Sequence, residues 1–576
     1  MVAPSTMPKA KPLSASGVTT SAHFGIAPSI PPTCHHASRP SVNPTIPLSM
    51  TTEHTITHPT LQCQLTGTLD ESGQVARYRG IRYATISKRW TRSRLVETLS
   101  GNVDARSYGP RCPQPDTLNN TADFGPHIPF PDCGQDDLDC LNLNVIAPKD
   151  VNEPLPVFFW IHGGSLLFGA ASDPIWEPTR LVRGSIEAGR PIVIISINYR
   201  LGLFGFLAPN DDSDPDSCRG NFGFHDQVNA LEWCQRHVGG FGGDPRRVTI
   251  GGESAGGCSV HAMITFQERL GEQRYFRRAV MQSGNFAVMG FWDRQRVDEI
   301  WGDALQELNL SGHDDPLDVM REVHWQRLLD TKTLAMDGYG VYSDGDFVSE
   351  PFLSARGDFL PSEPTVIDAV MHGDNADEGN IFRDAAASEG ALDRLSTIAR
   401  DILGEQAARE LLDIYGLSDT ASLDPSEVAW RLHRFPEDAR FYLPSDKLIW
   451  VWPRAAFYHL DAKSPFASAL WPKDCYHTHD LLYLFGNFDD FLQQDKNCAH
   501  LQLGERIRST WLAFIHGKEP WRGAFTGTAA RFTDQDVSFG PPEACRRWSM
   551  ERKERLRRVK GLGFARIVAV ATRAFP

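Results

Sequence analysis

A serine set between glycines is the feature of this 576-residue chain with the clearest chemistry. The run Gly-Glu-Ser-Ala-Gly at 252–256 places Ser254 just after the apolar stretch 248–250, which predicts a strand. A serine hydroxyl is a weak nucleophile, so it needs exposure, a base that takes its proton, and donors for the oxyanion. A strand turning sharply into a helix supplies exposure, and the N–H of Ala255 would be one donor. The pattern is short enough to be a chance glycine-rich turn, so its context matters.

A second glycine turn lies upstream of this serine. Residues 157–161 are apolar and predict a buried strand, and His-Gly-Gly-Ser follows at 162–165. A loop of this type, at the end of an earlier strand, supplies the remaining oxyanion donor in sites built around such a serine. A small-residue turn without function is the alternative. The order of the two motifs along the chain favours the functional interpretation.

Apolar runs and helical periodicity alternate through the chain. Further strands are predicted at 192–197, 279–281 and 369–371, and helices at 226–238 and 504–516. This alternation is typical of a doubly wound α/β sheet. The stretches 286–364 and 386–471 are helical and loop-rich, and we expect them to cover the strand ends rather than form separate units.

The two ends of the chain differ from this middle part. Residues 1–58 are rich in Pro, Ser and Thr, and we expect them to be disordered, with one domain over 59–560 and a tail over 561–576. A basic run at 551–558 has charges on all sides, which predicts a solvated helix. We find neither a signal peptide nor 18 consecutive apolar residues, so we expect a cytoplasmic protein without an integral membrane segment. Met50 is a plausible alternative start.

Charge and cysteine content exclude several classes of partner. The formal net charge of −14 argues against nucleic acid and anionic membranes. Eleven cysteines, an odd number, do not form a dense disulfide framework in a chain of this length. We expect no metal and no cofactor, and the sequence does not predict an oligomeric state.

Further motifs make the chain recognisable. It resembles the type-B carboxylesterase/lipase family, a branch of the α/β-hydrolases that includes cholinesterases and many fungal and bacterial esterases. The resemblance spans about residues 61–558 and is carried by motifs at 80–84, 139–145, 198–202, 220–257, 282–284 and 377–379. It implies the α/β-hydrolase fold: a large, mostly parallel, doubly wound sheet with helical insertions over the strand ends.

The resemblance also implies a triad in the order serine, glutamate, histidine. Glu378, in the Asp-Glu-Gly run at 377–379, takes the place of the acid, and His477 takes that of the base. His479 lies two residues further on and is the alternative base, although we expect it on the surface or behind the site. In the same register the oxyanion donors are Gly164, Ser165 and Ala255, while Glu253 and Ser283 stand beside the triad.

The sequence departs from the family pattern at several positions. Ser165 replaces a glycine of the usual three-glycine run, which we expect to narrow the pocket. Leu138 replaces a glutamate that pairs with the arginine here numbered 89, so we expect that ion pair to be absent. Cys112 and Cys140 match the family's first disulfide, with Cys133 as a possible competitor. The loop that they close lacks the tryptophan with which cholinesterases bind choline, so cholinesterase activity is not expected.

Together these features predict a serine carboxylic-ester hydrolase that works through an acyl-enzyme on a small or medium organic ester. A lipase or an acyl transferase of the same fold would share every motif. Adhesion-type homologues keep the fold without catalysis, but they lack triad residues, and this sequence has all three.

Overall fold

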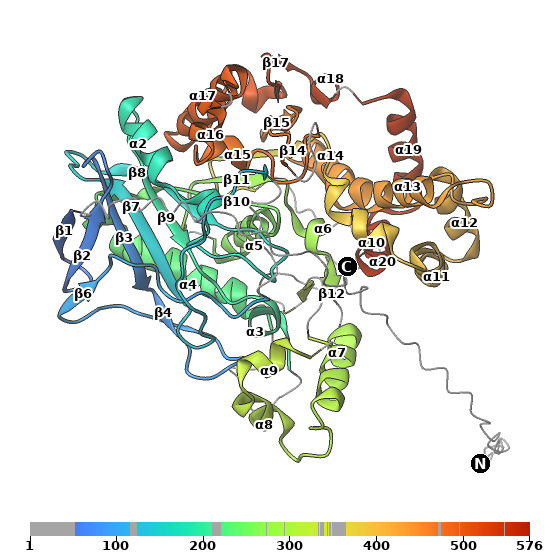
Figure 1. Cartoon of the computed structure of the whole chain (residues 1–576), viewed down its shortest axis with the longest axis horizontal. Coiled ribbons are helices and arrows are strands. Elements are labelled where there is room, and N and C mark those ends of the chain that lie inside the picture. The colour runs from blue at the N-terminus through green and yellow to red at the C-terminus, as the bar shows by residue number, and fades with distance from the viewer. Residues whose placement is uncertain are drawn as a thin grey trace, which may run out of the picture. The chain divides into compact units, whose positions relative to one another are not determined.

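A wide, mostly parallel sheet organises the described chain (Figure 1). The computed structural model describes residues 52–575, except 116–123, 210–219, 272, 293, 332, 335–338, 343, 345–346, 348–363, 470–473, 495 and 547. Across its 13 strands the order is β1 (Glu53–His58), β2 (Cys63–Leu69), β3 (Val75–Arg82), β7 (Asn142–Pro148), β9 (Val193–Ile197), β8 (Leu155–Ile161), β10 (Gly243–Glu253), β11 (Arg278–Gln282), β14 (Ala369–Asn375), β15 (Ala456–Leu460), β16 (Ala529–Phe532) and β17 (Val537–Gly540), with β6 (Asn102–Asp104) beside β2. Neighbouring strands from β9 to β16 are parallel.

Two pairs of short strands lie outside this sheet: β4 (Ala84–Thr85) with β5 (Arg94–Leu95), and β12 (Phe291–Trp292) with β13 (Val341–Tyr342). The helices are α2 (Thr179–Glu187), α3 (Gly202–Phe206), α4 (Phe222–His237), α5 (Ala255–Leu270), α6 (Phe286–Met289), α7 (Arg294–Glu307), α8 (Pro316–Glu322), α9 (Trp325–Leu329), α10 (Arg383–Ala387), α11 (Ala391–Leu403), α12 (Glu405–Ile414), α13 (Pro425–Glu437), α14 (Leu443–Val451), α15 (Leu481–Leu484), α16 (Asp489–Gln494), α17 (Cys498–Ile515), α18 (Pro542–Arg546), α19 (Met550–Gly561) and α20 (Phe564–Ala574).

Helices cover both faces of the sheet. In β9, Val193 and Ile195 pack into the core that contains apolar side chains of α4 and α5, whereas Ile194 packs into the core that contains those of α2 and α17. A strand buried on both faces needs apolar side chains at consecutive positions, which explains the apolar runs at 157–161 in β8 and 193–195 in β9. The predicted doubly wound α/β fold is therefore confirmed.

The boundaries of the domain differ from those we predicted. Strand β1 pairs with β2 over residues 53–58, where we expected disorder to continue. Its Ile56 packs against the main core and its His58 against Phe241, which anchors the strand. Helix α20 falls in the predicted tail, yet Ile567, Val568 and Val570 are buried in the main core. The expectation for residues 1–51 lies outside the described residues. Within the described chain no helix is long and apolar enough to cross a membrane.

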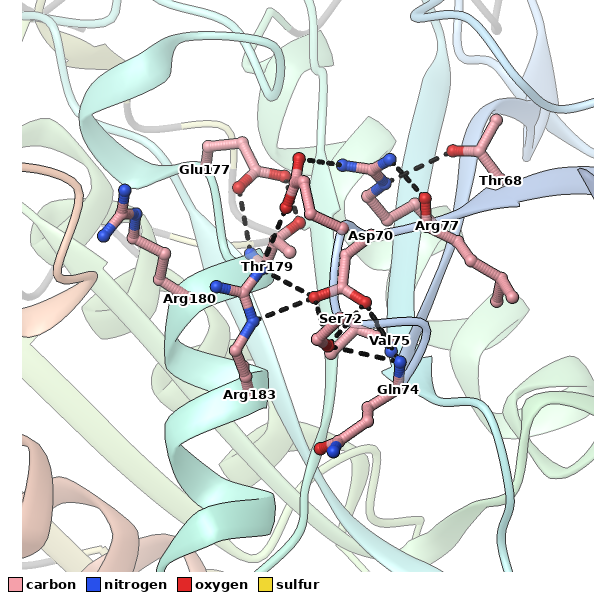
Figure 2. Close-up of polar contacts among 12 residues, drawn as sticks. Thr68, Asp70, Ser72, Gln74, Val75, Arg77, Glu177, Thr179, Arg180 and Arg183 are labelled. Carbon is pink, nitrogen blue, oxygen red and sulfur yellow. Dashed lines mark hydrogen bonds and ion pairs between the residues drawn. The ribbon is translucent and has the colours of Figure 1, made fainter. Parts of the chain in front are cut away.

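Helix α2 is anchored to the turn between β2 and β3. Figure 2 shows the Asp70 carboxylate surrounded by donors: the Ser72 hydroxyl, the backbone N–H groups of Gln74 and Val75, and the Arg183 guanidinium of α2. The Asp70 side chain is fully buried, and the Arg183 Nε lies 2.8 Å from Oδ2. A buried carboxylate satisfied on all sides fixes the hairpin to the helix that follows the 162–173 loop.

Candidate active site

Ser254 lies at the turn between β10 and α5, as the sequence predicts. Its φ of 56° and ψ of −121° place it outside the ordinary regions for a residue with a Cβ, a conformation that costs ~1–3 kcal/mol. The turn is held by hydrogen bonds from Ser254 N to Gln282 O at 2.8 Å and from Cys258 N to Ser254 O at 3.0 Å. Only glycine fits at position 256, because a Cβ there would lie 2.2 Å from the carbonyl oxygen of Ile161.

Glu378 and His477 form a buried pair at the carboxyl ends of neighbouring strands. Glu378 follows β14, and its Oε2 lies 2.6 Å from the Nδ1 of His477. Its Oε1 accepts hydrogen bonds from Ser283 Oγ at 2.7 Å and from Asn375 N at 2.6 Å. Burial raises the pKa of Glu378, while the hydrogen bond from His477 opposes that rise. A carboxylate at Nδ1 keeps the proton on that nitrogen and leaves Nε2 free to accept one.

His479, the alternative base, is excluded by its position. It is fully buried rather than on the surface, and its Nε2 lies 3.3 Å from the hydroxyl of Tyr483. Burial lowers the pKa of His479 to about 3. Thr478, with φ of 72°, separates the two histidines, so only His477 reaches Glu378.

The Nε2 of His477 faces the Ser254 turn but has no hydrogen-bond partner among the described residues. The nearest carboxylate oxygen, Oε1 of Glu253, lies 3.4 Å away. Burial, followed by the negative charges of Asp480 and Glu378, raises the pKa of Glu253 well above its usual range. In free enzymes the contact between nucleophile and base is often open and tightens when substrate binds.

The loop at 162–165 packs directly against the Ser254 turn. A Cβ on Gly163 would lie 2.6 Å from Glu253 O and 3.2 Å from the Cβ of Ser254, so only glycine fits. Gly164, Ser165 and Leu166 all have positive φ, of 101°, 55° and 55°. The carbonyl of Gly164 accepts hydrogen bonds from Leu167 N and Phe168 N and is therefore turned back into the loop.

The three predicted oxyanion donors are available for hydrogen bonding. None of the N–H groups of Gly164, Ser165 and Ala255 donates a hydrogen bond to a described residue. Ala255 begins a helix of 16 residues, whose N-terminus favours negative charge. The arrangement therefore offers unpaired donors beside the nucleophile.

The structure gives Arg89 an ion-pair partner and contradicts one prediction for the surrounding loop. Arg89 pairs with Asp137 and not with position 138, where Leu138 is 44% exposed. Cys112 and Cys140 are free thiols, not the disulfide that we expected. They lie together in the core, where a hydrogen bond from the Cys140 thiol to Cys112, together with burial, raises the pKa of Cys140 and keeps that thiol protonated. Cys133 instead lies 3.6 Å from Ser172 Oγ.

The sequence analysis missed three polar residues that hold the site together. Asn380 Oδ1 accepts a hydrogen bond from His477 N at 2.8 Å. Asp480 accepts from Gln282 Nε2 at 2.7 Å and from Tyr458 at 2.8 Å. Gln282 lies within the 282–284 motif and Asp480 directly follows His479, and these positions are the signal that could have identified them. No cluster of three or more His, Cys, Asp or Glu side chains suited to a metal occurs in the described part of the chain.

Comparison with known proteins shows the family to which the chain belongs. A family model described as "Carboxylesterase family" matches residues 55–539. The chain belongs to the carboxylesterase family. Relatives of this carboxylesterase include Lipase 3 of Yarrowia lipolytica, 30% identical over 80% of this chain and 89% of the relative. Para-nitrobenzyl esterase of Bacillus subtilis is 28% identical over 77% of this chain and 87% of its own.

Solved structures share the fold of this carboxylesterase. A PNB esterase structure superimposes with a TM-score of 0.67 at 24% identity, covering 88% of this chain and all of the other. The α/β-hydrolase fold that the sequence predicts is thus present.

Proposed function

We propose that this carboxylesterase hydrolyses small or medium organic esters, with Ser254 as nucleophile, His477 as base and Glu378 as the acid that orients the base. The observation that carries the proposal is the 2.6 Å contact between Glu378 Oε2 and His477 Nδ1, placed beside the strained Ser254 turn. A serine, a histidine and a buried carboxylate in this relation form the constellation that activates a hydroxyl for acyl transfer.

The reaction proceeds in two halves. His477 Nε2 takes the proton of Ser254 as Oγ attacks the ester carbonyl, and the imidazolium then gives that proton to the departing alcohol. The resulting acyl-serine is attacked by water, which loses a proton to the same nitrogen. Collapse of the second tetrahedral intermediate returns the proton to Ser254 and releases the carboxylic acid.

Glu378 stabilises the positive charge that forms on His477. Its second oxygen is held by Ser283 and Asn375, so the carboxylate cannot rotate away from the imidazole. Ser283 therefore acts as a positioning residue. Glu253 stands within 3.4 Å of Nε2 and shapes the polar surroundings of the base.

The N–H groups of Gly164, Ser165 and Ala255 would stabilise the oxyanion of both tetrahedral intermediates. They are unpaired in the described chain and lie on the two segments that pack together at the turn. Each such donor is worth ~3 kcal/mol of transition-state stabilisation in enzymes where it has been removed.

Hydrolysis of p-nitrophenyl esters from acetate to palmitate tests the proposal. We expect turnover by the wild type, none above background by Ser254→Ala, and the highest kcat/KM on the shorter acyl chains. Equal rates for the two proteins would refute the role of Ser254. A preference for emulsified long-chain esters would indicate a lipase, and ester products formed with added alcohol would indicate an acyl transferase.

A further inference from the structure

A cavity of about 270 Å³ is lined in part by the loop that carries Glu378. Ala376, two residues before Glu378, contributes to its wall. The remaining wall comes mainly from α13, the end of α18, the start of α19 and the residues between these two helices, with His459 and Asp461 at the end of β15. Its arginines and tryptophans are Arg434, Arg546, Arg552, Arg555, Trp430 and Trp548. Figure 1 shows α18, α13 and α19 towards the end of the sheet at which β15 and β17 lie. None of these residues has a part in the proposed reaction.

Arg546 is buried in this wall and is not fully satisfied. Only 2% of its side chain is exposed, and its guanidinium lies between the rings of Phe457 and Trp548, at 4.5 and 4.4 Å. Its Nη2 contacts Asp374 at 2.6 Å, but its Nε has no hydrogen-bond partner in the described chain. A buried N–H without an acceptor is costly, so an acceptor in the cavity would stabilise it.

Helix α19 contributes two arginines that point inward, contrary to the solvated helix that its basic sequence predicts. Arg552 and Arg555 are each only 11% exposed. Arg552 lies 3.0 Å from Glu437, and Arg555 Nε lies 2.7 Å from Asp438. Their inward position arises because Glu437 and Asp438 are fully buried and need counter-charges.

Cations exceed buried anions around the cavity. Arg434 also pairs with Glu437, at 3.0 Å, and its Nε has no hydrogen-bond partner among the described residues. Four guanidinium groups therefore share the buried carboxylates of Asp374, Glu437 and Asp438. This excess of one cation holds for the buried groups alone. Two further acids, Asp446 at 3.6 Å from Arg546 and Glu551 in the cavity wall, are exposed to solvent, which screens their charge, and Asp461 is paired with Arg531.

The cavity also has an apolar wall and a favourable helix end. Trp430 is 52% exposed, with the Arg434 guanidinium over its ring at 4.8 Å. Ser549 caps the 12-residue helix α19 by accepting a hydrogen bond from Arg552 N at 3.1 Å. The first turn of α19, which carries Glu551 and Arg552 in the cavity wall, adds its N-terminal dipole to the charge of the arginines.

We propose that this cavity binds a small organic carboxylate, its charged group against Arg434 and Arg546 and its apolar part against Trp430 and Trp548. Guanidinium groups match the planar geometry of a carboxylate, and indole rings supply flat apolar contact for the rest of the molecule. The volume limits the ligand to about the size of a substituted benzoate. The inference depends on no step of the proposed reaction.

Titration calorimetry with benzoate, and with benzamide as its uncharged counterpart, tests the site. We expect saturable benzoate binding that weakens as salt rises, and at least tenfold weaker binding of benzamide. Arg434→Gln should weaken benzoate binding at least fivefold. Arg431→Gln is the matched control, because Arg431 stands on the same helix, is also paired with a glutamate of that helix, and lies outside the cavity. It should bind as the wild type does.

A second pair of variants covers the case in which Arg434→Gln fails to fold. Trp430→Ala should weaken benzoate binding and reduce the quenching of tryptophan fluorescence by benzoate, because Trp548 still lines the cavity. Trp450→Ala, which removes a 76% exposed indole outside the cavity, should preserve both. Equal affinity for benzoate and benzamide would overturn the proposal. Equal benzoate binding by a cavity variant and its control would also overturn the proposal, because the benzoate would then bind elsewhere, for example in the Ser254 site. The test does not depend on esterase activity.

Discussion

Glu253 and His477 lie side by side without a hydrogen bond, the Oε1 of the first 3.4 Å from the Nε2 of the second. The carboxyl group precedes the nucleophile in sequence and is 1% exposed. Burial favours the neutral form of a carboxyl group, nearby negative charges add to this effect, and nearby positive charges oppose it. Here burial and the neighbouring acids favour the neutral form.

The raised pKa of Glu253 predicts a pH-dependent stability difference. The folded protein holds this proton more tightly than the unfolded chain does, so stability is lost as pH rises above the ordinary pKa, about 4.3, towards the higher folded value. Glu253→Gln cannot ionise and is spared that loss. The difference in Tm, variant minus wild type, should therefore increase from pH 5 to pH 9. A difference that stays constant, as we expect for the exposed control Glu410→Gln, would contradict the assignment.

Removing the charge of Glu378 should reduce kcat strongly. Glu378→Gln keeps the shape of the side chain but loses the negative charge that stabilises the His477 imidazolium, and a loss of about 10⁴-fold is typical of such a change. The neighbour Asp377 pairs with Arg383 at 2.7 Å and does not contact His477. Asp377→Asn should therefore stay within threefold of wild type in a p-nitrophenyl butyrate assay. Similar losses of kcat in both variants would show that a disturbed loop, and not the missing charge at position 378, lowers the activity.

The two histidines of the 477–479 loop should respond in opposite ways. His477→Gln should lower kcat by 10³-fold or more, because Ser254 then loses the imidazole that takes its proton. His479→Gln should keep kcat near wild type but lower stability by ~1–3 kcal/mol, since it disturbs a buried hydrogen bond to Tyr483. Active-site titration and urea unfolding measure the two effects separately. A His479 variant that folds normally yet is inactive would reverse the assignment.

Ser165 should affect both stability and acyl-chain preference. Its φ of 55° strains any residue with a Cβ, so Ser165→Gly should raise stability by ~1 kcal/mol, whereas Ser165→Ala should not. The glycine also removes a side chain beside the proposed oxyanion site, so the ratio of kcat/KM for octanoate to that for acetate should rise. An unchanged chain-length preference would show that this side chain does not narrow the pocket.

Local sequence determines much of this site. The apolar runs of β8, β9 and β10, and the glycines that follow two of them, require only neighbouring residues to be understood, because strand and turn preferences act over a few positions. Ser254 and the 162–165 loop are found in this way. Glu378 and His477 needed the family resemblance as well, since neither stands in a pattern that specifies its role by local chemistry.

Contacts between segments far apart in the sequence determine the features that local sequence does not predict. Glu378 and His477 are 99 positions apart, and only their 2.6 Å contact separates His477 from His479. Arg89 pairs with Asp137, whereas the adjacent Leu138 faces solvent. The sequence does not show in which direction either side chain points. Arg552 and Arg555 belong to a helix that looks solvated until Glu437 and Asp438 are seen beneath it. Burial of charge depends on which segments meet in space, and that is set by the tertiary structure.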